Sequence, residues 1–216
     1  MQPDCAAPPS GLVAPRCPTA KRLARDILLD SPVSMLHRTL DTDVSRALER
    51  VPADQLPNFR FTASSVELRS TLLRHFDVIS LEPAWLRDWP FNDVFFLARL
   101  FRYLTSASSV PVRLETITTN ACKRFHADNV RLRLATTYRG PGTQWLGARA
   151  LASQETGKPI SPDTIKSTPT GAILLIRGGN GATGTLPALL HRSPPIEGTG
   201  ISRLFLAVDD ADEFGS

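Results

Sequence analysis

The sequence predicts an α+β fold in which a helical N-terminal region covers a C-terminal antiparallel β-sandwich or barrel. Up to about residue 109, apolar side chains recur at helical spacing. Beyond it they alternate with polar side chains in short runs that Gly and Pro separate, with too little room between them for crossover helices. We therefore divide the chain into a disordered tail (1–20), a mixed helical covering region (21–109) and a β core (110–216).

Composition and charge argue against several classes of protein. No segment approaches the roughly 18–20 consecutive apolar residues of a membrane span, so we expect no membrane association. The net charge of +4 comes with few clustered basic residues, which argues against a nucleic-acid partner. Three cysteines make no disulfide framework, and the N-terminus lacks the pattern of a signal peptide. We expect a cytoplasmic protein.

The covering region begins with a short strand and a capped helix. The strand is expected over Ser34–Leu40. Asp41 or Thr42 can cap a helix that runs through Arg50 and stops before Pro52, since an internal proline removes a helical hydrogen bond.

Two further helices follow in the covering region. Ser64–Glu67 has the spacing of a capping box and predicts a helix whose apolar stripe includes Val66 and Leu72. The clearest helical pattern is Asn92–Ser106, where Asn92 caps and apolar residues recur every three or four positions. A helix this apolar needs a sheet to pack on.

Six strands are expected after residue 109. They are Val110–Thr119, Val130–Tyr138, Gln144–Ala150, Gly171–Arg177, Leu186–His191 and Ser202–Val208. The double-stranded β-helix, the fold of cupins and jelly rolls, accommodates this order of short strands. The long connection Lys158–Pro169 is typical of a functional lid.

A His-x-Asp pair stands at the head of the second of these strands. In an extended backbone the side chains of His126 and Asp128 leave the same face, and that face continues through Val130 and Leu132 to Tyr138. An imidazole and a carboxylate on one face are two of the three ligands of a 2-His-1-carboxylate iron(II) site. His191, further along the chain, is the candidate for the third ligand.

With these residues the chain resembles the iron(II)/2-oxoglutarate-dependent dioxygenases, and among them the prolyl-hydroxylase-like branch. The matching positions, in order, are His126-x-Asp128, Arg133-x-x-Thr136, Tyr138, Gly140-Pro-Gly-Thr143, Gly171-Ala-Ile-Leu, His191, Pro194-Pro-Ile-x-Gly198 and Arg203. Arg203 stands where many members of that branch have Lys. The segment from Thr116 to Asp209 also resembles an uncharacterised bacterial family that shares the patterns FHxD and TYxGPGTxWL.

The resemblance implies an oxygenase that uses dioxygen to hydroxylate or demethylate a small-molecule or protein substrate. The iron(II) ligands that it implies are His126, Asp128 and His191. The residues that it implies for binding the co-substrate 2-oxoglutarate are Arg203, Tyr138 and Thr136. Arg203 would grip the distal carboxylate in fork geometry, and Arg177 and Arg192 are the alternatives to it.

Two other hypotheses remain open at this stage. Cys122 precedes His126 by four residues, and a thiolate with two imidazoles would favour zinc over iron, although a buried, inert cysteine is the plainer interpretation. The chain could also be a non-catalytic, cupin-like protein that binds a metal, iron or zinc, or senses a ligand.

A glycine motif gives a competing interpretation, which the following residues disfavour. Gly179, Gly181 and Gly184 spell GxGxxG after a predicted strand. A dinucleotide site needs a helix to begin at these glycines, and Pro187 and Pro194 leave no room for one. We predict a turn between strands here.

Removal of residues 1–20 should leave folding and metal binding intact, because a segment with five prolines and no apolar periodicity buries little surface. Thermal melting and metal titration of the truncated protein measure both. A melting temperature many degrees below that of the full chain would contradict the prediction.

Overall fold

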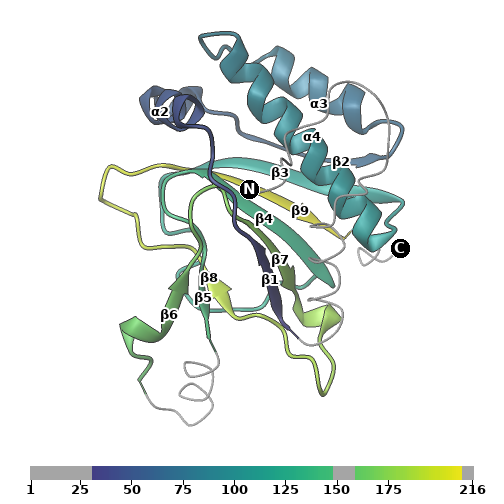
Figure 1. Cartoon of the computed structure of the whole chain (residues 1–216), viewed down its shortest axis with the longest axis vertical. Coiled ribbons are helices and arrows are strands. Elements are labelled where there is room, and N and C mark those ends of the chain that lie inside the picture. The colour runs from purple at the N-terminus through teal and green to yellow at the C-terminus, as the bar shows by residue number, and fades with distance from the viewer. Residues whose placement is uncertain (1–30, 148–158, 211–216) are drawn as a thin grey trace, which may run out of the picture.

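The part of the chain that the structure describes forms two antiparallel sheets and three α-helices, an α+β architecture as predicted (Figure 1). The computed structural model describes residues 31–147 and 159–210, so the predicted tail lies outside the described residues. The larger sheet has six strands in the order β1-β7-β4-β9-β3-β2, and the smaller has three in the order β6-β5-β8. The helices lie against one face of the larger sheet, and the smaller sheet lies on its other side (Figure 1).

The strands of the larger sheet come from both regions of the chain. They are β1 (Val33–Leu36), β2 (Phe59–Ser64), β3 (Ser109–Ile117), β4 (Leu132–Arg139), β7 (Ile173–Arg177) and β9 (Arg203–Asp209). The smaller sheet consists of β5 (Gln144–Leu146), β6 (Ile165–Ser167) and β8 (His191–Arg192). Strands β1 and β2 precede residue 110 and form the two edges of the larger sheet, so the covering region and the β core share one sheet.

The first two helices follow their sequence signals closely. Helix α2 (Thr42–Arg50) is capped by Asp41, whose carboxylate accepts a hydrogen bond of 2.8 Å from the backbone N–H of Asp43. Helix α3 (Leu68–Asp77) follows the Ser64–Glu67 contact, in which the serine hydroxyl donates to the glutamate at 2.6 Å. The helix begins only after Glu67, however, so Val66 precedes it and is exposed rather than part of the apolar stripe.

Helix α4 (Trp85–Thr105) begins seven residues before the predicted start at Asn92 and contains Pro90. The sequence pattern predicts a helix that begins after Pro90, because proline has no backbone N–H to donate within a helix. In the folded protein the extra turns bury Leu86 completely, with 0% of its surface exposed, and Pro90 is buried as well. Apolar burial against the neighbouring elements outweighs the local cost of the proline.

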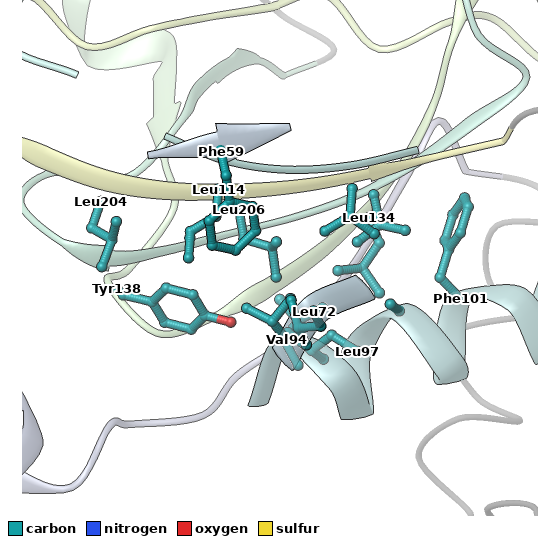
Figure 2. Packing of buried hydrophobic residues seen from close by; sticks show 14 of the residues in the cluster. Phe59, Leu72, Val94, Leu97, Phe101, Leu114, Leu134, Tyr138, Leu204 and Leu206 are labelled. Carbon is teal, nitrogen blue, oxygen red and sulfur yellow. The ribbon is translucent and has the colours of Figure 1, made fainter. Parts of the chain in front are cut away.

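The central strands are buried on both faces. On the helix side, Leu134 and Leu206 pack against Val94 and Leu97 of α4 (Figure 2). On the other side a smaller cluster is formed by Ala135, Leu174, Ile176 and Leu189, with Trp145 and Phe205 packed against it. A strand covered on both faces has no polar side, which is why β7 reads as a continuous apolar run rather than an alternating one.

Between residues 144 and 192 the structure differs from the predicted elements in three places. Leu186–His191 is mostly irregular, and only its last residue enters β8. Strand β5 ends at Leu146, and the residues from 148 to 158 lie outside the described part of the chain. The predicted lid, from residue 159 onward, contains a 3₁₀ turn (η2, Pro162–Thr164) and strand β6, which pairs with β5.

The glycine motif forms a 3₁₀ turn (η3, Gly179–Gly181), as predicted, and no α-helix follows it within the described residues. Among the residues that the structure describes, no helix is both long and apolar enough to cross a membrane.

A charged cluster joins α4 to the larger sheet on the helix side. Asp93 accepts two hydrogen bonds from Arg38, at 2.6 and 2.7 Å, and one from the Tyr138 hydroxyl at 2.7 Å. Burial, with the nearby Asp93 carboxylate, raises the pKa of Tyr138 well above its ordinary value, so the hydroxyl stays protonated and can donate. Arg38 also donates to the carbonyl of Gly171 at 2.7 Å, so the cluster ties four segments together.

Replacing Asp93 with Ala should lower the free energy of unfolding by about 3 kcal/mol, because it leaves Arg38 and the Tyr138 hydroxyl without their shared acceptor. Urea unfolding measures this loss. Metal affinity is the control and should not change, since the cluster lies on the helix side of the sheet. An unfolding free energy equal to that of the parent would show that the cluster does not stabilise the fold.

Candidate metal centre

Two segments far apart in the sequence meet at an isolated β-bridge between His126 and His191. The N–H of each residue donates to the carbonyl of the other, at 3.0 and 2.9 Å. His191 is the first residue of strand β8. In the smaller sheet β5 is the central strand, and β8 and β6 are the two edges. The bridge places the two imidazole rings side by side, with 4.8 Å between their centroids.

The outer nitrogen of each ring contacts a backbone carbonyl. Nδ1 of His126 lies 3.0 Å from the carbonyl oxygen of Arg124, and Nδ1 of His191 lies 3.2 Å from that of Leu189. Because a carbonyl only accepts, each contact places a proton on Nδ1, so Nε2 is the nitrogen left for a metal ion. These Nε2 atoms lie 3.6 Å and 3.0 Å from the carboxylate oxygens of Asp128, for His126 and His191 respectively.

This group of atoms fits a metal ion. The ligand atoms of His126, Asp128 and His191 all lie within 4.8 Å of one another, and within the described ranges this is the group of His, Cys, Asp and Glu that could hold a metal. Ligands bound at about 2.1 Å from one ion stand about 3 Å apart, so small side-chain movements complete the site. Two imidazoles and one carboxylate on one side of an ion leave its other positions open.

The carboxylate of Asp128 is charged before any metal arrives. Its side chain is 10% exposed, and this burial by itself would raise its pKa. The hydrogen bond with His191 and the charges of Arg133 and the two histidines outweigh burial and lower the pKa to about 2. A metal ion therefore meets a deprotonated ligand at neutral pH.

A buried arginine without an acidic partner lies on the same side of the larger sheet. Arg203, the first residue of β9, is 1% exposed. Its guanidinium donates to the Thr137 hydroxyl at 3.3 Å and lies over the Phe205 ring, 5.2 Å from the centroid. Its Nε has no hydrogen-bond partner, and no carboxylate of the described residues forms an ion pair with it. Burial lowers the pKa of Arg203 to about 10, which leaves it charged at neutral pH.

The sequence pattern placed the wrong residues of β4 on the same face as His126 and Asp128, because the alternation is shifted by one residue. Bends between Asn129 and Arg131 interrupt the extended backbone, and β4 starts only at Leu132, so the alternation does not carry over from Asp128. Arg133 therefore faces the metal centre, where it contacts Asp128.

Thr136 and Tyr138 lie on the other side of the larger sheet. Thr136 pairs with Leu206 and Ile173, which belong to the core under the helices, and the Tyr138 hydroxyl binds Asp93 there. Sequence reasoning missed Thr137, which lies beside Arg203. Thr137 could have been found by counting the alternation of β4 from Leu132, because it then lies on the same face as Arg133.

The remaining candidates occupy other positions. Cys122 is exposed, not buried as expected, and does not belong to the metal-ligand group. Arg192 donates to the Gln144 side chain at 2.9 Å and lies over the Phe125 ring. Arg177 is buried at the end of β7 and donates to the carbonyl of Gly181 at 3.2 Å.

The family model described as protein of unknown function (DUF1826) matches residues 16–209 of the chain. The chain belongs to the DUF1826 family. The matched range includes His126, Asp128, His191 and Arg203 of this DUF1826 protein. No curated protein matches its sequence.

Solved structures that resemble this DUF1826 protein include several described as oxygenases. A putative oxygenase from Shewanella oneidensis is 14% identical, with 88% of this chain and 86% of that chain covered and a TM-score of 0.46. A Pseudomonas putida prolyl-4-hydroxylase is 13% identical over 93% and 98%, with a TM-score of 0.47. The dioxygenase for auxin oxidation 1 from Arabidopsis thaliana, in a 2-oxoglutarate complex, is 12% identical over 89% and 76%, with a TM-score of 0.43. Such identities and scores do not identify a function.

Replacing His126 or Asp128 with Ala should abolish tight iron(II) binding and leave the fold in place, because both side chains lie at the edge of the site and not in the apolar core. Anaerobic titration with iron(II) and thermal melting measure the two properties. Cys122→Ser is the control and should bind iron(II) like the parent. If Cys122→Ser loses the metal, or if either site variant keeps it, the ligand set is different.

Proposed function

We propose that this DUF1826 protein is an iron(II)- and 2-oxoglutarate-dependent oxygenase that hydroxylates or demethylates a small-molecule or protein substrate. In this proposal the two sheets are the two halves of a double-stranded β-helix, with the metal centre between them. His126, Asp128 and His191 would hold the iron. Iron(II), when bound, supplies the redox chemistry with dioxygen that protein side chains lack.

The single observation that carries the proposal is the buried, uncompensated charge of Arg203. An isolated charge out of water costs several kcal/mol unless an opposite charge comes to it. The described residues provide no carboxylate for Arg203, so an anionic ligand is its natural partner. A guanidinium matches a carboxylate with two parallel hydrogen bonds.

Thr137 would complete the binding site for that carboxylate. Its hydroxyl oxygen accepts from Arg203 at 3.3 Å, so its proton is directed elsewhere and can be donated to a second acceptor. Thr137 would thus take the role that the family resemblance implied for Thr136 and Tyr138. A ligand with a carboxylate at one end and metal-binding oxygens at the other fits both parts of the site, and 2-oxoglutarate has this form.

Apolar side chains would shield the site from water. Phe205 and Trp145 pack with the small cluster on this side of the sheet, and Trp145 is the register partner of His191 between β5 and β8. Exclusion of water strengthens the interaction between Arg203 and a bound carboxylate. It also limits side reactions of a site that activates dioxygen.

Replacing Arg203 with Ala should weaken 2-oxoglutarate binding by about 10–150-fold, because a charge-assisted contact contributes roughly 1.5–3 kcal/mol. Iron(II) affinity should hardly change. Arg203→Lys should recover part of the loss, since an ammonium keeps the charge without the fork geometry. Anaerobic titration of the iron(II)-loaded protein with 2-oxoglutarate, followed by its chelate absorption band, measures the affinity.

Arg192→Ala is the matched control, because Arg192 follows His191 directly but binds Gln144 and Phe125 instead. It should leave 2-oxoglutarate affinity unchanged. If the parent binds iron(II) and shows no chelate band, the protein is a metal-binding or ligand-sensing protein and not an oxygenase of this class. If the parent shows the chelate band, a screen for substrate-stimulated release of succinate would identify its substrate.

A further inference from the structure

Arg133 connects the proposed metal centre to strand β9. Its NH1 atom lies 2.5 Å from Oδ2 of Asp128. Its other two nitrogens bind the carboxylate of Asp209, Nε at 2.5 Å from Oδ1 and NH2 at 2.8 Å from Oδ2. One guanidinium therefore contacts two carboxylates. The side chain of Arg133 is 12% exposed, that of Asp128 10% and that of Asp209 15%.

The contact restricts how Asp128 can bind a metal. Oδ2 lies 2.5 Å from NH1 of Arg133 and 3.0 Å from Nε2 of His191, whereas Oδ1 lies 3.6 Å from Nε2 of His126. A dication on Oδ2 would stand close to the positive guanidinium, and repulsion between like charges is strong at a site with little water. Binding through Oδ1 avoids this repulsion.

Asp209 keeps the site attractive to a cation. An arginine beside a metal ligand would by itself oppose the metal. Here the bidentate pair of Arg133 with Asp209 is neutral overall, so the charge of Asp128 remains for the metal. The pairing is built into the sheet, since Arg133 and Asp209 are direct partners in the register of β4 and β9.

We infer that Arg133, held by Asp209, is a positioning residue that makes Asp128 bind the metal through one oxygen only. This inference rests on the metal centre proposed above. A one-oxygen carboxylate occupies a single coordination position, whereas a chelating carboxylate would occupy two. The positioning by Arg133 thus keeps one more position open for a co-substrate or dioxygen.

The test uses Co(II) as a spectroscopic stand-in for iron(II) and the full chain. Arg133→Gln should change Co(II) affinity by about 10–100-fold, the usual effect of losing a partner of a metal ligand. The visible absorption bands of the Co(II) complex should also change, because the freed Oδ2 can join the coordination. Arg133→Lys should stay closer to the parent than Arg133→Gln in both measurements, since an ammonium can still hold Oδ2. Asp209→Asn should weaken Co(II) binding, because the guanidinium then faces the cation uncompensated.

Arg131 provides a matched control, because it directly precedes β4 and its partner Asp210 directly follows β9. It binds Asp210 through its Nε at 2.8 Å, an Arg–Asp contact like that of Arg133 with Asp209. Arg131→Gln should therefore affect thermal stability through its loss of the contact but leave Co(II) affinity and the absorption bands unchanged. Thermal melting of each variant separates misfolding from a change at the metal.

The outcomes are distinct. If Arg133→Gln and Asp209→Asn fold and show the affinity and bands of the parent, Arg133 does not position Asp128. If Arg131→Gln changes Co(II) affinity and the absorption bands as much as Arg133→Gln, the effect is one of general stability and the inference is wrong. If the parent itself binds no Co(II), the proposed metal centre fails, and the positioning role fails with it.

Discussion

The bridge between His126 and His191 is the constraint on which the site depends. Its two backbone hydrogen bonds fasten the segment before β4 to a strand of only two residues, β8. So short a strand has little pairing of its own, and its other partner is β5. Because both bridged residues are histidines, this backbone pairing also brings the two imidazole rings of the candidate metal centre together.

The larger sheet separates two kinds of buried charge. On the helix side, Asp93 satisfies Arg38 and the Tyr138 hydroxyl, and the cluster stabilises the packing of α4. On the other side, Arg133 is shared between Asp128 and Asp209, while Arg203 has a hydroxyl but no carboxylate among the described residues. An external anion on this side of the sheet would compensate the charge of Arg203.

The sequence by itself determined the local elements and the residue types of the site. Helix α2 follows from its Asp41 cap, and the Gly- and Pro-separated runs of alternating residues gave an antiparallel fold. His126, Asp128 and His191 could be named as candidates because their order along the chain, with the Gly-Pro-Gly turn and Arg203, resembles that of a known oxygenase family. The helix and the alternating runs depend on neighbours in the chain, and local physical chemistry is sufficient to specify them.

Only the tertiary structure decided which side chains face one another. Bends after Asp128 shift the alternation, so that Arg133 and Thr137 face the site and Tyr138 faces α4. Burial extends α4 through Pro90 against its local preference, and β1 and β2 join a sheet that the sequence assigned to the later residues. The register of β4 with β9 sets Asp209 beside Arg133. The physical reason is the same in each case: a one-residue change in strand phase reverses every side chain, and contacts distant in sequence fix that phase.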